Sequence, residues 1–203
     1  RLRTVTGVQT CALPISLTIQ LEIQILQTPK EVLILYVNDH KVRHVRLNEE
    51  HPKNLAPSWQ GDSIGHYEGD TLVVDTVGIK TGPFSTLDRY GTPMSSQMHV
   101  VERYRLIDGK AAAEAALKHA RTFNARAALN KFDGYGAELD LNPARQGLQA
   151  EVTVDDPGTF TKAWKGLVTY LPESIWPEMI CAENLRESDG RDRTLPFAAK
   201  PDF

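Results

Sequence analysis

The chain has 203 residues, which is enough for one domain of ordinary size or two small ones. It is 41% hydrophobic and 24% charged, a composition of folded globular proteins that excludes collagen-like, disordered and coiled-coil classes. The 23 basic and 26 acidic residues give a net charge of −3, which argues against nucleic acid or an anionic membrane surface as the main partner. No apolar run reaches the roughly 18 residues that a membrane span needs.

The first residues, RLRTVTGVQTCALPIS (Arg1–Ser16), resemble the translated read-through of a sequencing adapter. On that interpretation they carry no information about the fold. Residues 17–203 are then a single β-rich domain that lacks its N-terminal part. The alternative is a short strand at Arg3–Val8 followed by a loop. Excluding the segment removes Cys11 and leaves Cys181 as the only cysteine, so we expect no disulfide within the chain.

The first clear strands lie at Glu31–Val37 and Val42–Leu47. The former is a short apolar run rich in β-branched residues, as expected of a buried strand, and the latter alternates loosely between apolar and polar residues. The intervening Asn38–Lys41 is typical of a turn. Together the two segments predict a hairpin.

The strongest local signal is a second hairpin, formed by Ser63–Glu68 and Thr71–Thr76 around Gly69–Asp70. A two-residue connection with glycine first suits a tight hairpin turn, because that position needs a positive φ. The register predicts one face with Tyr67, Leu72, Val74 and Thr76, and an opposite face with Ile64, His66, Glu68, Thr71, Val73 and Asp75.

The remainder predicts more strands and one helix. In chain order we expect a polar loop at 78–93, a strand at Met98–Ile107, an Ala-rich helix at Lys110–Phe123, an excursion at Asn124–Gly147, a strand at Leu148–Val154, a returning strand at Phe160–Leu171, a strand or short helix at Ser174–Ala182, and an extended tail at Glu187–Phe203. Sequential hairpins predict a mainly β fold, an antiparallel meander that forms a closed or partly closed barrel, with a sandwich as the alternative.

Several strings together resemble an uncharacterised family of exported bacterial all-β proteins. They are SIGHYEGDTLVVDTVGI (Ser63–Ile79), LDRYGTP (Leu87–Pro93), MHVVERYRLIDG (Met98–Gly109), VTVDDPGTFTKAW (Val152–Trp164), ICAENLRE (Ile180–Glu187) and KPDF (Lys200–Phe203). The resemblance covers residues 27–203 and implies an all-β fold and a periplasmic or secreted location. The family's N-terminal Asp-Leu-Ser-Gly-x-Trp segment is not present, so the chain resembles its C-terminal part. The resemblance implies no chemistry.

Glu102 is the first candidate catalytic residue, because it lies between Val100 and Tyr104 on an apolar strand face. A desolvated carboxylate there suits acid or base chemistry. The alternative is a structural ion pair with a neighbouring arginine. Arg103 and Asp156 are candidate assisting residues.

The alternatives for these assisting residues are structural. Arginines on strands, here Arg43, Arg46, Arg103 and Arg105, extend to solvent, tie carboxylates on adjacent strands, or recognise an anion. Asp156 belongs to Asp155–Gly158, which is typical of a turn.

Aromatic residues supply the candidate ligand-binding set, namely Tyr67, Tyr104, Trp164 and Tyr170. Such side chains stack on sugars or line apolar pockets, and the alternative is packing in the core. His66, Glu68 and Asp75 on one hairpin face form a possible metal or acid/base set, with a solvated face as the alternative. We predict neither a metal nor a cofactor.

Two functions follow from these patterns. The first is binding of a small apolar or glycan-like ligand in a barrel. The alternative is a cofactor-independent hydrolase, lyase or isomerase that uses Glu102 as general acid or base. The motifs of common hydrolases, metalloproteases and thiol-redox proteins do not occur in the sequence.

Overall fold

The computed structural model describes residues 3–6, 22–36, 41–82, 85–87, 91–123 and 141–172. Its elements in chain order are β1 (Arg3–Thr6), β2 (Glu22–Gln27), β3 (Glu31–Tyr36), β4 (Val42–Leu47), β5 (Asp62–Glu68), β6 (Thr71–Val77), β7 (His99–Ile107), α1 (Gly109–Phe123), β8 (Gly147–Asp155) and β9 (Trp164–Tyr170). The predictions for 174–182 and 187–203, and most of the predicted excursion, fall outside the described residues, as does Cys181.

The strands form one sheet whose spatial order is the chain order from β1 to β9. Neighbouring strands are antiparallel, except that β4 and β5 run parallel. Residues 48–61 make this exception, because they carry the chain back to the end where β4 began; a tight hairpin cannot join parallel strands. The predicted meander is therefore confirmed, with one crossover inserted.

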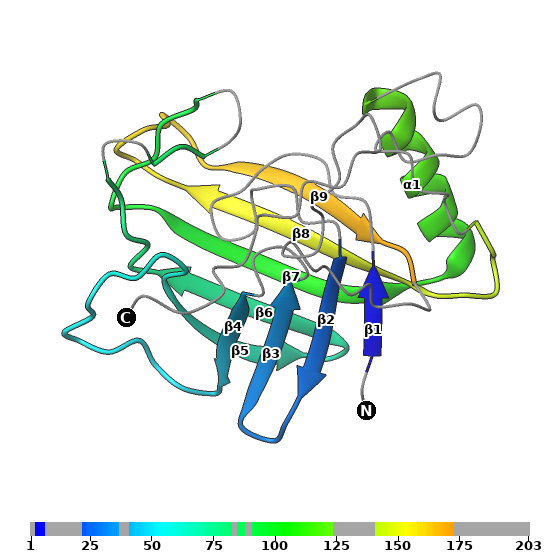
Figure 1. The fold of residues 1–203 in the computed structure, drawn as a ribbon, viewed down its shortest axis with the longest axis horizontal. Helices are drawn as coiled ribbons and strands as arrows, with labels where there is room; N and C mark the ends of the chain where they lie inside the picture. Colours follow the sequence, from blue (N-terminus) through cyan, green and yellow to red (C-terminus); the bar gives the residue numbers. More distant parts are fainter. Residues whose placement is uncertain are drawn as a thin grey trace, which may run out of the picture.

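The sheet is curled into a half-barrel, with β1–β4 crossing β6–β9 (Figure 1). Its concave face holds the core, in which residues of β2–β4 pack against residues of β6–β9. The buried members from the two halves include Ile23, Val32, Ile34 and Val45, and Leu72, Val74, Val100, Val152 and Val168. The mainly β, partly closed barrel with one helix is thus as predicted.

The second hairpin has the predicted register, with Glu68 opposite Thr71 and Tyr67 opposite Leu72. Gly69 begins the turn at a φ of 58°, a conformation that disfavours side chains with a Cβ. Val74 and Thr76 on the predicted inner face are fully buried. The alternation of apolar and polar residues was sufficient to place this hairpin.

The sequence analysis missed one strand and placed the start of another too early. Strand β2, which pairs with both β1 and β3, was not assigned, because its alternation of Ile23, Gln24 and Ile25 is short. Strand β9 begins at Trp164 rather than Phe160, because the backbone N–H of Phe160 is bound to the Asp156 carbonyl in a turn. The alternative strand at Arg3–Val8 coincides with β1, and the adapter interpretation of these residues stays a prediction.

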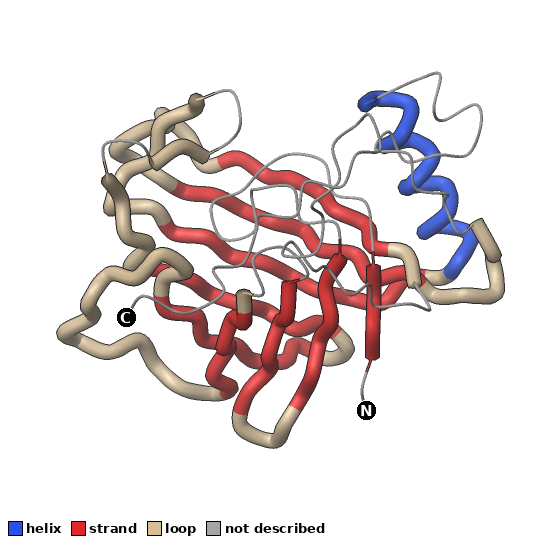
Figure 2. Tube along the Cα trace, in the orientation of Figure 1, coloured by secondary structure: helices blue, strands red, loops and turns tan. Residues whose placement is uncertain are grey.

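Helix α1 confirms the predicted Ala-rich helix. Asp108 caps it, accepting a hydrogen bond from the Ala111 backbone N–H at 3.0 Å. The helix lies at one end of the sheet, where Ala112, Ala116 and Ala120 are buried and contact the β8–β9 region (Figure 2). Among the described residues, no helix has the length and apolar character that a membrane crossing requires.

The close approach of β4 to β5 depends on Gly65. A methyl group there would lie 2.8 Å from Val45 Cγ1, in a fully buried part of the core. We expect Gly65→Ala to lower the free energy of unfolding by about 1–3 kcal/mol, measured by urea denaturation. Gly82→Ala is the control, since only Ser85 Oγ lies near its site, at 3.8 Å. Equal stability of both variants would contradict this packing.

Candidate functional site

A cluster of polar side chains lies inside the apolar core of the half-barrel. Arg43 of β4 is its centre and is 1% exposed. Its Nε donates to Ser63 Oγ at 3.0 Å, and its Nη2 donates to Thr76 Oγ1 at 2.7 Å. Ser63 and Thr76 are opposite each other on β5 and β6, and their hydroxyls are 2.9 Å apart. The arginine therefore reaches across two strands.

The same guanidinium ends on Glu102 of β7, with 2.5 Å between Arg43 Nη2 and Glu102 Oε2. Glu102 is 3% exposed, and its second oxygen accepts a hydrogen bond from Tyr104 Oη at 2.9 Å. Burial alone would lower the pKa of Arg43, but the charge of Glu102 raises it above its ordinary value. Both carboxylate oxygens of Glu102 therefore have partners, Arg43 and Tyr104.

Three tyrosines, Tyr36, Tyr104 and Tyr170, surround this ion pair. Burial raises the pKa of each phenol, and the nearby charge of Glu102 raises it further. For Tyr36 the guanidinium of Arg43 acts in the opposite direction, which places that phenol beside the cation. All three phenols therefore keep their protons at neutral pH, and the Tyr104 hydroxyl donates its proton to the Glu102 hydrogen bond.

Tyr36 Oη and Arg43 Nη1 make no hydrogen bond of ordinary geometry among the described residues, but the Tyr36 phenol lies against the Arg43 guanidinium, and a looser hydrogen bond between the two side chains lowers the pKa of that phenol. Both belong to side chains that are at most 3% exposed. Most buried polar groups in folded proteins have a hydrogen-bond partner, and leaving one unmade is costly. The contact between these two side chains therefore belongs to the buried cluster.

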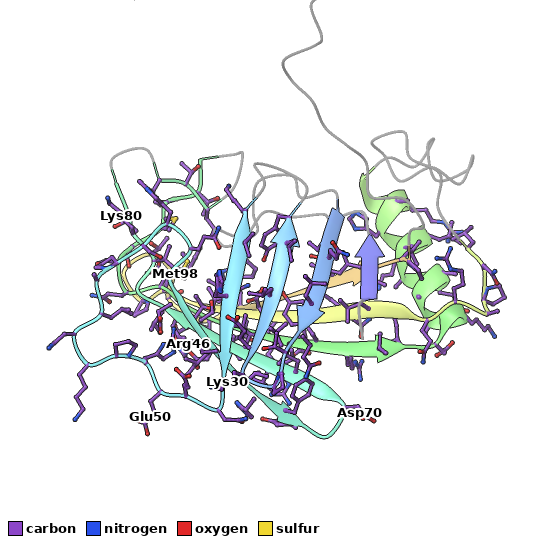
Figure 3. All side chains as sticks on the ribbon, turned by 60° about the horizontal axis from the view of Figure 1, so that its bottom comes forward. Lys30, Arg46, Glu50, Asp70, Lys80 and Met98 are labelled. Carbon is purple, nitrogen blue, oxygen red and sulfur yellow. The ribbon has the colours of Figure 1, made fainter. Side chains whose placement is uncertain are left out.

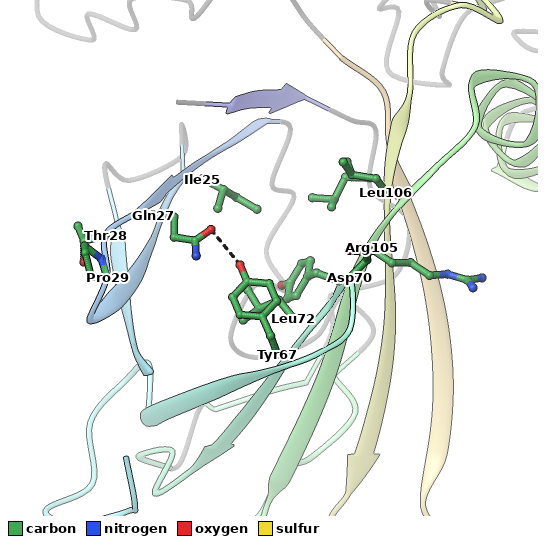
Figure 4. A pocket seen from close by; sticks show the side chains of 11 residues that line it. Ile25, Gln27, Thr28, Pro29, Tyr67, Asp70, Leu72, Arg105 and Leu106 are labelled. Atoms are coloured by element: carbon green, nitrogen blue, oxygen red, sulfur yellow. Dashed lines mark hydrogen bonds between the residues drawn. The ribbon is translucent and has the colours of Figure 1, made fainter. Parts of the chain in front are cut away.

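A pocket of about 640 Å³ opens beside the cluster, at the end of the half-barrel formed by the β2–β3 and β5–β6 turns. Most of its lining is apolar or aromatic. The lining residues are Ile25, Gln27, Thr28, Pro29, Tyr67, Asp70, Leu72, Tyr104, Arg105, Leu106 and Leu148 (Figure 4). Tyr104 belongs to both features, because its side chain lines the pocket and its hydroxyl binds Glu102.

Tyr67 spans one side of this pocket. Its hydroxyl donates to Gln27 Oε1 at 3.0 Å, joining the end of β5 to the end of β2 (Figure 4). The Arg105 guanidinium points away from the pocket and donates to Gln149 Oε1 at 2.8 Å. The interior is therefore contributed chiefly by carbon atoms, with polar groups at its edge.

The three candidate catalytic residues are not brought together. Glu102 lies inside the barrel, whereas Arg103 on the same strand faces outward and forms an ion pair with Glu68. Asp156 is buried in the turn after β8, where Ser95 N–H donates to Oδ2 at 2.7 Å and the Ser95 hydroxyl bonds to Oδ1. These contacts match the structural alternatives, in which Glu102 pairs with an arginine and Asp156 forms a turn.

The four candidate ligand-binding aromatics separate into two groups. Tyr67 and Tyr104 line the pocket. Tyr170 is 3% exposed within the core, and Trp164 packs edge-on against Phe160 with ring centroids 6.1 Å apart. Packing is thus the role that the structure gives the latter two. Tyr36 was missed, although its place at the end of a buried strand could have indicated an inward hydroxyl.

A second polar network lies on the outer face. Asp62 accepts two hydrogen bonds from Arg46 at 2.6 and 3.0 Å, and its Oδ2 is 2.6 Å from His51 Nδ1. His51 Nε2 and His99 Nε2 both approach Asp75 Oδ1, at 3.1 and 3.0 Å. Figure 3 shows Arg46 on this side of the sheet. The network attaches the 48–61 crossover to β5 and β6.

The residues of the possible metal set on the hairpin take part in two separate groups of ion pairs. Glu68 interacts with His66 and Arg103, whereas Asp75 interacts with His51 and His99. Within the described part of the chain, no group of three histidine, cysteine or acidic side chains is arranged to hold a metal ion. The described His66 and Glu68 are exposed, as the alternative of a solvated face predicts.

Comparison with known proteins gives no match to this chain among family models, curated proteins or solved structures. The geometry of the half-barrel is therefore the basis for inferring function.

Replacing Glu102 tests the ion pair. Glu102→Gln leaves a buried, unpaired cation at Arg43, so we expect the free energy of unfolding to fall by about 3–5 kcal/mol. Combining it with Arg43→Met should cost clearly less than the sum of the two single changes, as measured by urea denaturation. Glu151→Gln on the outer face, where the partner is exposed Lys165, is the control and should change stability by less than about 0.5 kcal/mol. Additive effects at Arg43 and Glu102 would contradict the pairing.

The outer network predicts a pH dependence. The hydrogen bonds from Arg46 and then from His51 lower the pKa of Asp62 below its ordinary value of 3.8. Its stabilising contribution is therefore present above that value and is lost as the pH falls through the lower folded-state pKa. Asp62→Asn should destabilise the protein by about 1–2 kcal/mol at neutral pH. The difference from the parent should shrink as the pH falls below 3.8. Asp70→Asn at the exposed hairpin tip is the control, and a pH-independent Asp62→Asn effect would refute the assignment.

Proposed function

We propose that this protein binds a small, largely apolar ligand in the pocket at the end of the half-barrel. The observation that carries the proposal is the pocket of about 640 Å³, which lies in the size range of sites for small molecules. A curled antiparallel sheet suits this role, because its concave face provides inward side chains on every strand.

The lining favours an apolar ligand over a glycan. Leu72, Leu106 and Leu148 supply aliphatic surface, and Tyr67 and Tyr104 supply aromatic surface. A sugar needs many hydrogen-bonding groups around its hydroxyls. Here the Arg105 guanidinium points away, and the Tyr67 hydroxyl is already bound to Gln27. The ligand class best matched to the pocket is therefore an apolar body with few polar atoms.

The enzymatic alternative stays a prediction. In the described structure both oxygens of Glu102 are occupied, by Arg43 and by Tyr104, so the carboxylate acts as part of the core. The periplasmic or secreted location and the relation to exported bacterial all-β proteins rest on the sequence resemblance, and we include both in the proposal. An extracytoplasmic carrier of an apolar compound is consistent with them.

The pocket can be tested with ethylnaphthalene as the probe and calorimetry as the measurement. Leu106 lines the pocket and is 38% exposed, so Leu106→Gln should leave the fold intact and weaken binding by about tenfold. Leu167 on β9 is 58% exposed and lies outside the pocket, so Leu167→Gln is the matched control and should bind like the parent. Absence of binding by the parent, or equal loss in both variants, would refute the proposed site.

A further inference from the structure

Asp70 is the acidic side chain at the mouth of the apolar pocket. It is exposed at the tip of the β5–β6 hairpin and belongs to the lining (Figure 3). No hydrogen bond or ion pair joins its carboxylate to another described residue. The other charged residue of the lining, Arg105, points its guanidinium away from the pocket and donates to Gln149 (Figure 4). Lys30 in the facing turn is exposed and is not part of the described lining. The charge that faces the pocket is therefore negative.

The hydroxyl groups of the lining already donate to protein acceptors. The Tyr67 hydroxyl donates to Gln27, and the Tyr104 hydroxyl donates to Glu102. The Thr28 hydroxyl donates to a backbone carbonyl of its own turn. The Gln27 amide nitrogen is a neutral donor at the same edge. The charge at the mouth therefore decides which charge on a ligand is favoured.

A carboxylate beside aromatic rings favours a cation. An aspartate carboxylate is negatively charged and accepts hydrogen bonds without donating any. Tyr67 and Tyr104 line the same pocket, and the face of a tyrosine ring attracts a cation through its quadrupole. An ammonium group carries the charge that both features attract and supplies N–H donors to the carboxylate. A ligand carboxylate would instead meet a like charge.

We infer that the pocket binds an amphipathic amine, whose apolar body occupies the interior and whose ammonium group lies at the mouth against the Asp70 carboxylate. This inference rests on the proposed ligand-binding function and adds the chemical class of the ligand's polar group. Because Asp70 is exposed, the ammonium group keeps part of its contact with water, and little desolvation is required. For the same reason the attraction is moderate.

The test uses three naphthalene probes that carry an aminomethyl, an ethyl or a carboxylate group at the same ring position. Naphthylmethylamine is protonated at neutral pH and has nearly the shape of ethylnaphthalene, so these two probes differ chiefly in charge. We expect the full chain to bind naphthylmethylamine at least as tightly as ethylnaphthalene, and to bind naphthoate most weakly. Calorimetry at neutral pH measures the three affinities.

Asp70→Asn isolates the contribution of the carboxylate. Asparagine has the same size and is accepted after glycine in a hairpin turn, so the melting temperature and the affinity for ethylnaphthalene should stay unchanged. Naphthylmethylamine should bind about fivefold more weakly than to the parent. Asp155→Asn is the matched control, because Asp155 is exposed at the opposite end of β8 from the lining residue Leu148. It should bind all three probes like the parent.

Ionic strength supplies a readout that a change in packing at Asp70 would not alter. Raising the salt concentration to about 1 M shortens the Debye length to about 3 Å. The affinity for naphthylmethylamine relative to ethylnaphthalene should therefore fall with salt in the parent. In Asp70→Asn the same ratio should change much less.

The outcomes separate the two proposals. An Asp70→Asn variant that binds naphthylmethylamine like the parent would overturn the amine site. A parent that binds ethylnaphthalene or naphthoate more tightly than naphthylmethylamine would also overturn it. In each of these cases, binding of ethylnaphthalene leaves the apolar pocket standing. Failure of all three probes to bind would remove the proposed function and the inference together.

Discussion

The ion pair between Arg43 and Glu102 is the interaction on which the half-barrel depends. It joins β4 to β7 across β5 and β6, at a position where the apolar core would otherwise be continuous. Strand β4 is also the strand that pairs in parallel with β5, and no hairpin turn fixes the register of that pairing. Serine and threonine hydroxyls on the two intervening strands bind the same guanidinium, so a one-residue shift of either strand would remove a partner of a buried cation.

The same constraint shapes the interior available to a ligand. Arg43 is held by Ser63, Thr76 and Glu102, and the Tyr36 phenol lies against its guanidinium. A half-barrel leaves one end open, and the apolar pocket occurs at that end, next to Tyr104. The buried ion pair and the apolar pocket are therefore neighbours, and Tyr104 contributes to both.

Local patterns in the sequence were sufficient for most of the fold and for part of the site. The Gly69–Asp70 turn fixed a hairpin, and the alternation around Glu102 placed that carboxylate on the buried face. The arginine partner was a stated alternative, but its identity was not determined, because Arg43 and Glu102 are brought together only by the order of four strands. The same holds for the pocket, whose lining comes from turns far apart in the chain. The alternation of residues along single strands does not show which distant residues the fold brings into contact.

Arg103 shows that the fold can also separate residues that are adjacent in the sequence. It follows Glu102 in the chain, and that proximity made it a candidate partner, yet successive side chains of a strand point to opposite faces. Arg103 therefore meets Glu68 on the outer surface, whereas the cation that Glu102 meets comes from β4. In a β protein, function has to be sought among residues two apart on one strand and opposite one another on neighbouring strands. By that criterion Glu102, Tyr104, Arg43 and Tyr36 form one unit, because Glu102 meets Tyr104 on its own strand and Arg43 from β4, and Tyr36 lies against that arginine.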